Sequence, residues 1–175
     1  MPAVGRKFDM TLRYSIIVIL ILVFLPAIGQ DRREMCQRVL NRNKIDKSFV
    51  FDKSTKADGQ NITTFKYLGL VKASNGRIYK FMTEGFVWGL NSHTSGRILI
   101  FNHRNNYVGE YVLSDAFQLP DKLRNGIMFF SNSDAPDCDK GVLTKISVAK
   151  GLPKRIFIKC SETSGDVYSF TSEGY

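Results

Sequence analysis

The sequence predicts a mainly β protein, an antiparallel meander forming a sandwich or barrel, with one N-terminal amphipathic helix. From Ser48 onward, short apolar segments alternate with Gly, Asn, Asp and Ser, as is typical of strands joined by turns. The connections between these segments are too short for the crossover helices that parallel strands require. We therefore expect the strands to pair as antiparallel hairpins.

The helix is expected over residues 32–42. Asp31 and Glu34 have the spacing of a capping box, with Asp31 as the N-cap residue. Apolar side chains then repeat at helical spacing, at Met35, Cys36, Val39 and Leu40. The outer face carries arginines, namely Arg32, Arg33, Arg38 and Arg42. This face is either solvated or a basic surface for an acidic partner, and Arg38 and Arg42 are its candidate binding residues.

The strand pattern covers most of the remaining chain. A short turn of helix is expected between residues 114 and 124. Residues 74–81 and 94–101 share Gly, Arg, Ile and Phe at equal offsets, which predicts a tight turn at Gly76 and at Gly96. Strands are expected at residues 48–51, 63–72, 77–82, 86–90, 97–101, 107–114, 126–131, 143–149, 155–160 and 166–171.

The N-terminus has the pattern of a cleavable signal peptide. Arg6, Lys7 and Arg13 precede an apolar run at residues 16–25, and the small residues Ala27 and Gly29 follow it. Cleavage after Gly29 would make residues 1–29 the signal and residues 30–175 a single β-rich domain, secreted or periplasmic, that meets a membrane only during export. The alternative is an uncleaved anchor, although the apolar run is about half of the roughly 20 residues that span a bilayer.

The charge is strongly positive, with 25 basic and 16 acidic residues and a net charge of +9. Removal of residues 1–29 would leave 22 basic and 15 acidic residues and a net charge of +7. Such a surplus favours acidic partners, here an acidic protein or an anionic envelope glycan. Export argues against nucleic acid. The alternative role of the positive charge is to keep an exported protein soluble.

Cys36, Cys138 and Cys160 give an odd count after the signal. In an oxidising compartment this predicts one disulfide and one spare thiol. We favour a bond between Cys138 and Cys160, because a cysteine in a polar loop can adapt to one at the end of a strand. Cys36 on the helix remains an alternative partner for either.

Aromatic residues are concentrated in the predicted sheet. Most are expected in the core, because alternate positions fill the interior of a sandwich or barrel. Trp88 is flanked by Gly89 and is a candidate stacking platform for a sugar ring or a side chain, with Tyr79 or Tyr111 beside it. The competing interpretation places all three rings in the core.

The sequence contains no motif of a hydrolase, metalloprotease or nucleotide enzyme, and no cofactor is expected. Asp134, Asp137 and Asp139 are weak candidates for a Ca²⁺ site in a loop that is otherwise a solvated disulfide loop. The expected function is a non-catalytic binding or interaction module for an envelope component, glycan or protein. The alternatives are a glycan or ester hydrolase that uses carboxylates such as Glu84, Glu110 and Asp115, and an inhibitor of an acidic secreted enzyme.

Overall fold

The computed structural model describes residues 27–172 of the chain. The chain divides into two compact units, Met1–Met35 and Cys36–Tyr175. All the described strands belong to the second unit. The predicted signal peptide lies outside the described residues except for its last three positions, and the expected cleavage site after Gly29 falls within the first turn of a helix.

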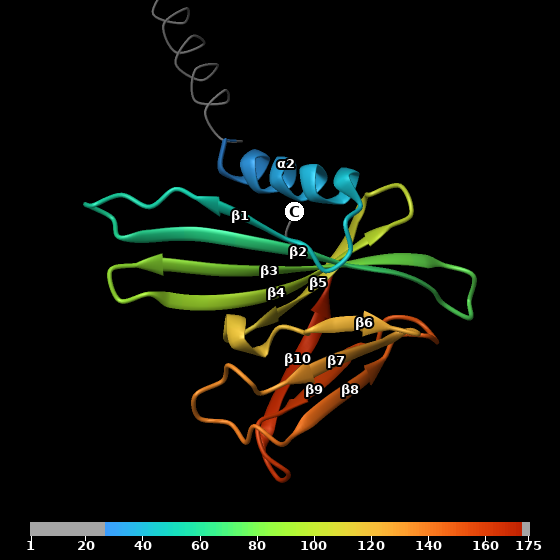
Figure 1. Cartoon of the computed structure of the whole chain (residues 1–175). Helices are drawn as coiled ribbons and strands as arrows, with labels where there is room; N and C mark the ends of the chain where they lie inside the picture. Colours follow the sequence, from blue (N-terminus) through green and yellow to red (C-terminus); the bar gives the residue numbers. More distant parts are fainter. Residues whose placement is uncertain (1–26, 173–175) are drawn as a thin grey trace, which may run out of the picture. The chain divides into compact units, whose positions relative to one another are not determined.

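The described part of the chain contains one α-helix, one short 3-10 helix and a series of strands (Figure 1). Helix α2 spans Ala27–Arg42, and the 3-10 helix η1 spans Ala116–Gln118. The strands are β1 (Ser48–Asp52), β2 (Gln60–Lys72), β3 (Ile78–Gly89), β4 (His93–Asn102), β5 (Tyr107–Leu113), β6 (Lys122–Arg124), β7 (Ile127–Ser131), β8 (Leu143–Ser147), β9 (Arg155–Lys159) and β10 (Gly165–Thr171).

All strand pairs are antiparallel, as predicted, and they form two sheets. The larger sheet has seven strands in the order β1-β2-β3-β4-β5-β10-β9, and the smaller has three in the order β6-β7-β8. Neither sheet closes into a barrel, so the prediction holds in its sandwich-like form. The meander is interrupted once, where β6 to β8 leave the larger sheet and β10 pairs with β5.

One face of the larger sheet shares a hydrophobic core with the smaller sheet. Phe81, Ile98 and Tyr111 of the larger sheet belong to the same buried cluster as Met128 and Phe130 of β7. Side chains alternate between the two faces of a strand, so every second residue of β3, β4 and β5 enters this core. Burial of large side chains of this kind contributes roughly 1.5–3 kcal/mol each.

The opposite face of the sheet contains a second set of buried side chains, among them Phe65, Met82 and Leu99. The strand register places Met82 opposite Leu99 and Phe65 opposite Glu84. Residues 36–42 of α2 lie on this face. The helix is held to the β4–β5 turn by two hydrogen bonds, from Gln37 Nε2 to the Asn105 carbonyl at 2.9 Å and from Asn105 Nδ2 to Asn41 Oδ1 at 3.2 Å. The predicted periodicity of the helix is confirmed, because Cys36, Val39 and Leu40 are all buried.

The predicted start of the helix is wrong. Helix α2 is already formed at Ala27, so Asp31 lies inside the helix and cannot act as its N-cap. Residues 27–30 include Ala27 and Gln30, which are good helix formers, and only Gly29 disfavours the helix. Asp31 and Glu34 therefore have capping-box spacing without the capping role.

The structure also corrects the strand pattern near Gly85 and Gly96. The two strands predicted at residues 77–82 and 86–90 are one continuous strand, β3, and Gly96 is paired within β4 opposite Gly85 rather than lying in a turn. A Cβ atom on Gly96 would approach the Asp115 carbonyl oxygen to 2.7 Å. The paired glycines thus leave room for the segment around η1, whereas Gly76 does occupy the predicted turn with φ of +79°.

Among the described residues, no helix has both the length and the apolar character needed to cross a bilayer.

Candidate functional site

A groove lies between α2 and the edge strand β1. It has a volume of about 240 Å³ and is lined on the helix side by Arg38, Val39 and Arg42, and on the strand side by Phe49, Val50 and Phe51. The Arg42 guanidinium lies over the Phe49 ring, 5.5 Å from its centroid. Arg38 and Arg42 are one helical turn apart, so both side chains reach the same side of the groove. The structure thus brings together the two arginines that the sequence singles out.

Strand β1 forms one edge of the seven-stranded sheet, and no described strand pairs with its outer side. Its sequence, Ser-Phe-Val-Phe-Asp, contains no lysine or proline, and the Val50 side chain is 63% exposed. The other edge strand, β9, carries Arg155 and Lys159, which are typical protection against pairing with another chain. Strand β1 is therefore the less protected of the two edges.

An aromatic row lies on the same face of the sheet as Phe49 and Phe51. The Phe86 and Trp88 rings are stacked with centroids 5.2 Å apart, and the His93 ring lies 5.8 Å from Trp88. The register pairs Phe51 with Thr63 and Thr63 with Phe86, so the row lies about 10 Å, or two strand spacings, from the groove. Trp88 is 37% exposed and is the accessible member of the predicted platform.

Tyr79 and Tyr111 do not lie beside Trp88. Tyr79 is an odd number of residues from Trp88 in the same strand, so the two side chains point to opposite faces of the sheet. Tyr111 is fully buried in the core between the sheets and donates a hydrogen bond to the Pro153 carbonyl at 2.6 Å. Burial raises the pKa of Tyr111 above its usual value. The structure therefore separates Trp88 from the two tyrosines, which both belong to the core between the sheets.

The candidate catalytic carboxylates are engaged in structural contacts. Glu84 and Glu110 are buried on the same face of the sheet as Met82 and Leu99, and Arg97 bridges them from β4 between their strands. Arg97 Nη1 lies 2.6 Å from Glu110 Oε1, and its Nε lies 3.8 Å from Glu84 Oε2. Asp115 accepts hydrogen bonds from Thr94 Oγ1 and from the Phe117 amide, which makes it the N-cap of η1. A neutralising guanidinium between two glutamates leaves this pair poorly suited to acid and base roles.

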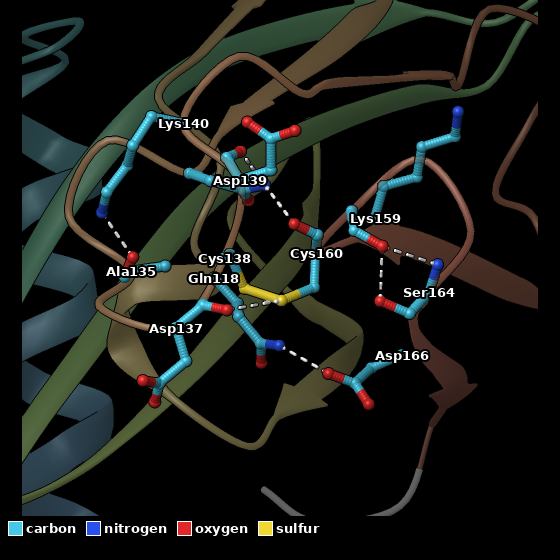
Figure 2. The surroundings of a disulfide bond; sticks show 12 residues. Gln118, Ala135, Asp137, Cys138, Asp139, Lys140, Lys159, Cys160, Ser164 and Asp166 are labelled. Carbon is cyan, nitrogen blue, oxygen red and sulfur yellow. Dashed lines mark hydrogen bonds between the residues drawn. A yellow bond between two sulfur atoms is a disulfide. The ribbon is translucent and has the colours of Figure 1, made fainter.

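The Cys138–Cys160 disulfide is present, as predicted (Figure 2). It fastens the loop between β7 and β8 to the end of β9, and a hydrogen bond from the Asp139 amide to the Cys160 carbonyl at 2.8 Å supports the same junction. A structural disulfide is typical of an oxidising compartment. Cys36 is the cysteine outside this bond, and it is buried.

The loop that contains the three candidate metal ligands is organised around a lysine. Lys140 Nζ donates hydrogen bonds to the Ser133 and Ala135 carbonyls, so the ammonium group of this lysine binds two of the backbone oxygens of the loop. Asp139 Oδ1 accepts the Gly141 amide. Among the residues that the structure describes, no group of three or more His, Cys, Asp or Glu side chains has the arrangement of a metal site, and this includes Asp134 and Asp137.

Sequence reasoning identified Arg38 and Arg42 but missed Phe49, Val50 and Phe51 as their neighbours. The segment was recognised as a strand, but its position at the edge of the sheet depends on the pairing of the whole sheet. Comparisons of the chain with protein-family models, with curated proteins and with solved structures found no match.

Proposed function

We propose that the protein is an exported, non-catalytic binding module that engages an acidic protein at the groove between α2 and β1. The observation that carries this proposal is that two arginines and the less protected edge strand of the sheet line one groove. A partner segment in extended conformation would add to the open edge of β1 through main-chain hydrogen bonds. Its acidic side chains would meet Arg38 and Arg42.

The division of roles follows from the chemistry of the two sides of the groove. Main-chain pairing along β1 supplies affinity without regard to sequence, whereas guanidinium groups select carboxylates through charge-assisted hydrogen bonds. Phe49 and Phe51 are half-buried and offer apolar contact for alternate side chains of the added strand. The favoured ligand is therefore a short extended segment in which apolar and acidic residues alternate.

The disulfide supports the export part of the proposal, because such bonds are typical of an oxidising compartment. The apolar run at residues 16–25 has the pattern of a cleavable signal, which supports a secreted or periplasmic product. Mass spectrometry of that product is expected to find an N-terminus near Gln30. Recovery of the chain with its Met1 terminus intact would contradict cleavage.

The binding proposal is tested by selecting random short peptides on the purified protein. We expect the enriched peptides to be rich in Asp and Glu, and the double substitution Arg38→Gln with Arg42→Gln to weaken their binding about tenfold, since each lost ion pair at a partly exposed site contributes up to about 1 kcal/mol. The salt dependence of binding is expected to become flatter, because fewer charges are screened.

The matched control removes two positive charges elsewhere. Lys122 and Lys145 flank the Phe129 ring on the smaller sheet, at 5.5 and 5.8 Å from its centroid. Replacing both lysines with glutamine lowers the net charge by the same amount and is expected to change peptide binding less than about twofold. Enrichment of peptides without acidic residues, or equal losses in the two double variants, would contradict the proposal.

A further inference from the structure

A second basic region lies where three connections meet at one end of the larger sheet, on the right of Figure 1. These are the β2–β3 turn at residues 73–77, the β4–β5 turn at residues 103–106 and the β8–β9 connection at residues 148–154. Two hollows of about 560 and 490 Å³ adjoin there and share Arg77, Tyr79 and Val108 in their walls. Lys150 lines the first hollow, and His103 lines the second.

The charge of this region is one-sided. The three connections contain Arg77, Arg104, Lys150 and Lys154 and no aspartate or glutamate. None of the residues that line either hollow is acidic. By contrast, the polar groove beside η1 mixes Lys66 with Asp121 and Asp134. At the junction of the three connections, no lining carboxylate reduces the positive potential. In the groove beside η1, Asp121 and Asp134 do reduce it.

The connections are fixed by backbone hydrogen bonds. The Ser74 amide donates to the Ala149 carbonyl at 2.8 Å, which joins the first connection to the third. The Arg77 amide donates to Asn75 Oδ1 at 3.0 Å, and the Arg104 and Asn106 amides both donate to Asn102 Oδ1. The cations thus project from ordered turns, and binding a ligand would not first have to order these loops.

We propose that this region is a second binding site, for an acidic polysaccharide. Arg77 and Lys150 line the first hollow, and Arg104 and Lys154 lie outside both hollows on the second and third connections. The four cations are thus spread over three connections, which suits a chain with repeating negative charges better than a single small anion. Sulfate or carboxylate groups on successive sugars would lie against Arg77 and Lys150, and the polar Asn75 and Ser147 side chains would meet sugar hydroxyls. The oxidising compartment indicated by the disulfide favours a glycan over nucleic acid.

The test measures binding of a fluorescent heparin oligosaccharide of defined length to the purified protein. We expect the double substitution Arg77→Gln with Lys150→Gln to weaken binding at least about tenfold and to lower the slope of log affinity against log salt by about two. The charge-preserving pair Arg77→Lys with Lys150→Arg is expected to retain most of the affinity. Unchanged circular dichroism and melting temperature would establish that the variants are folded.

Two controls separate a site from general attraction between opposite charges. Replacing Lys122 and Lys145 with glutamine, or Arg38 and Arg42 with glutamine, removes the same number of charges and is expected to weaken heparin binding less than about twofold. Equal losses in all three double variants would overturn the site. Tighter binding of a single-stranded DNA of matched length would overturn the assignment to a glycan. Because the controls include the α2–β1 groove, this site and that groove succeed or fail separately.

Discussion

Arg97 is the residue on which the charged part of the core depends. Glu84 and Glu110 are 6% and 2% exposed, and the single Arg97 side chain lies between them. Such a group of charges costs desolvation energy to bury, so it adds less to stability than its Coulomb attraction suggests. Removing only the cation is a different matter, because two buried carboxylates would then lose this counter-charge.

We expect Arg97→Met to lower the free energy of unfolding by about 3 kcal/mol, the lower end of the range for breaking a buried ion pair, since the Arg97 side chain is itself one-third exposed. Urea unfolding measures the change. Arg104→Met on an exposed turn is the control and is expected to stay within about 0.5 kcal/mol. A loss in Arg97→Met no larger than in the control would show that the glutamates do not need this cation.

Tyr111 is expected to make the protein less stable in alkali. Burial raises the pKa of Tyr111, so the folded protein keeps the phenol proton above about pH 10, where the unfolded chain releases it. The free energy of unfolding therefore falls as the pH rises through that range. In Tyr111→Phe this fall in stability is expected to be smaller, because the Tyr111 phenol is gone. It is not expected to vanish, because burial also raises the pKa of Tyr67.

At neutral pH, Tyr111→Phe is expected to cost about 1 kcal/mol through the lost hydrogen bond to the Pro153 carbonyl. Urea unfolding at about pH 8 and about pH 11 separates the two effects. Identical pH dependence in Tyr111→Phe and the natural protein would mean that Tyr111 ionises as readily in the folded state as in the unfolded chain.

Among the elements, the disulfide loop makes the firmest stability prediction. The bond between Cys138 and Cys160 closes a segment with a sequence separation of 22. Replacing both cysteines with alanine is expected to lower the free energy of unfolding by about 3 kcal/mol, chiefly by freeing the unfolded chain. In denaturant without reductant, alkylation is expected to modify only Cys36. Three modified thiols under those conditions would rule out the disulfide.

The strands themselves could be predicted because each depends on local alternation and local turn residues. The antiparallel pairing and every strand except β6 were recovered in this way. The disulfide was predicted separately, from one cysteine in a polar loop and one at the end of a strand. The division at residues 83–85 was wrong because Gly85 resembles a break, and only the tertiary structure shows that it makes room near η1. Side chains alternate between the two faces along the continuous strand β3, so Trp88 and Tyr79 point to opposite faces. A pattern that divided β3 into two strands could not predict this.

Only the helix side of the groove between α2 and β1 could be predicted from the sequence. Arg38 and Arg42 follow from helical periodicity, which is local. The edge position of β1 follows from the order of all seven strands, and the convergence of three turns around Arg77 follows from the same order. Neither property is contained in any short segment of the sequence.

On the scale of the whole molecule, the positive charge is organised rather than uniform. One basic surface lies along α2 and β1, and another lies at the junction of the three connections. Two sheets and a disulfide provide a fixed frame for both. Our two proposals assign the first surface to an acidic peptide segment and the second to an acidic glycan.

The most direct test of the central claim is amide hydrogen exchange of the protein with and without an acidic peptide selected on it. Strand addition would pair the outer edge of β1, so we expect slower exchange at residues 48–52 and at the end of α2 that carries Arg38 and Arg42. The same protection is expected to disappear when both arginines are replaced with glutamine. Protection confined to other strands, with residues 48–52 exchanging at an unchanged rate, would contradict the account.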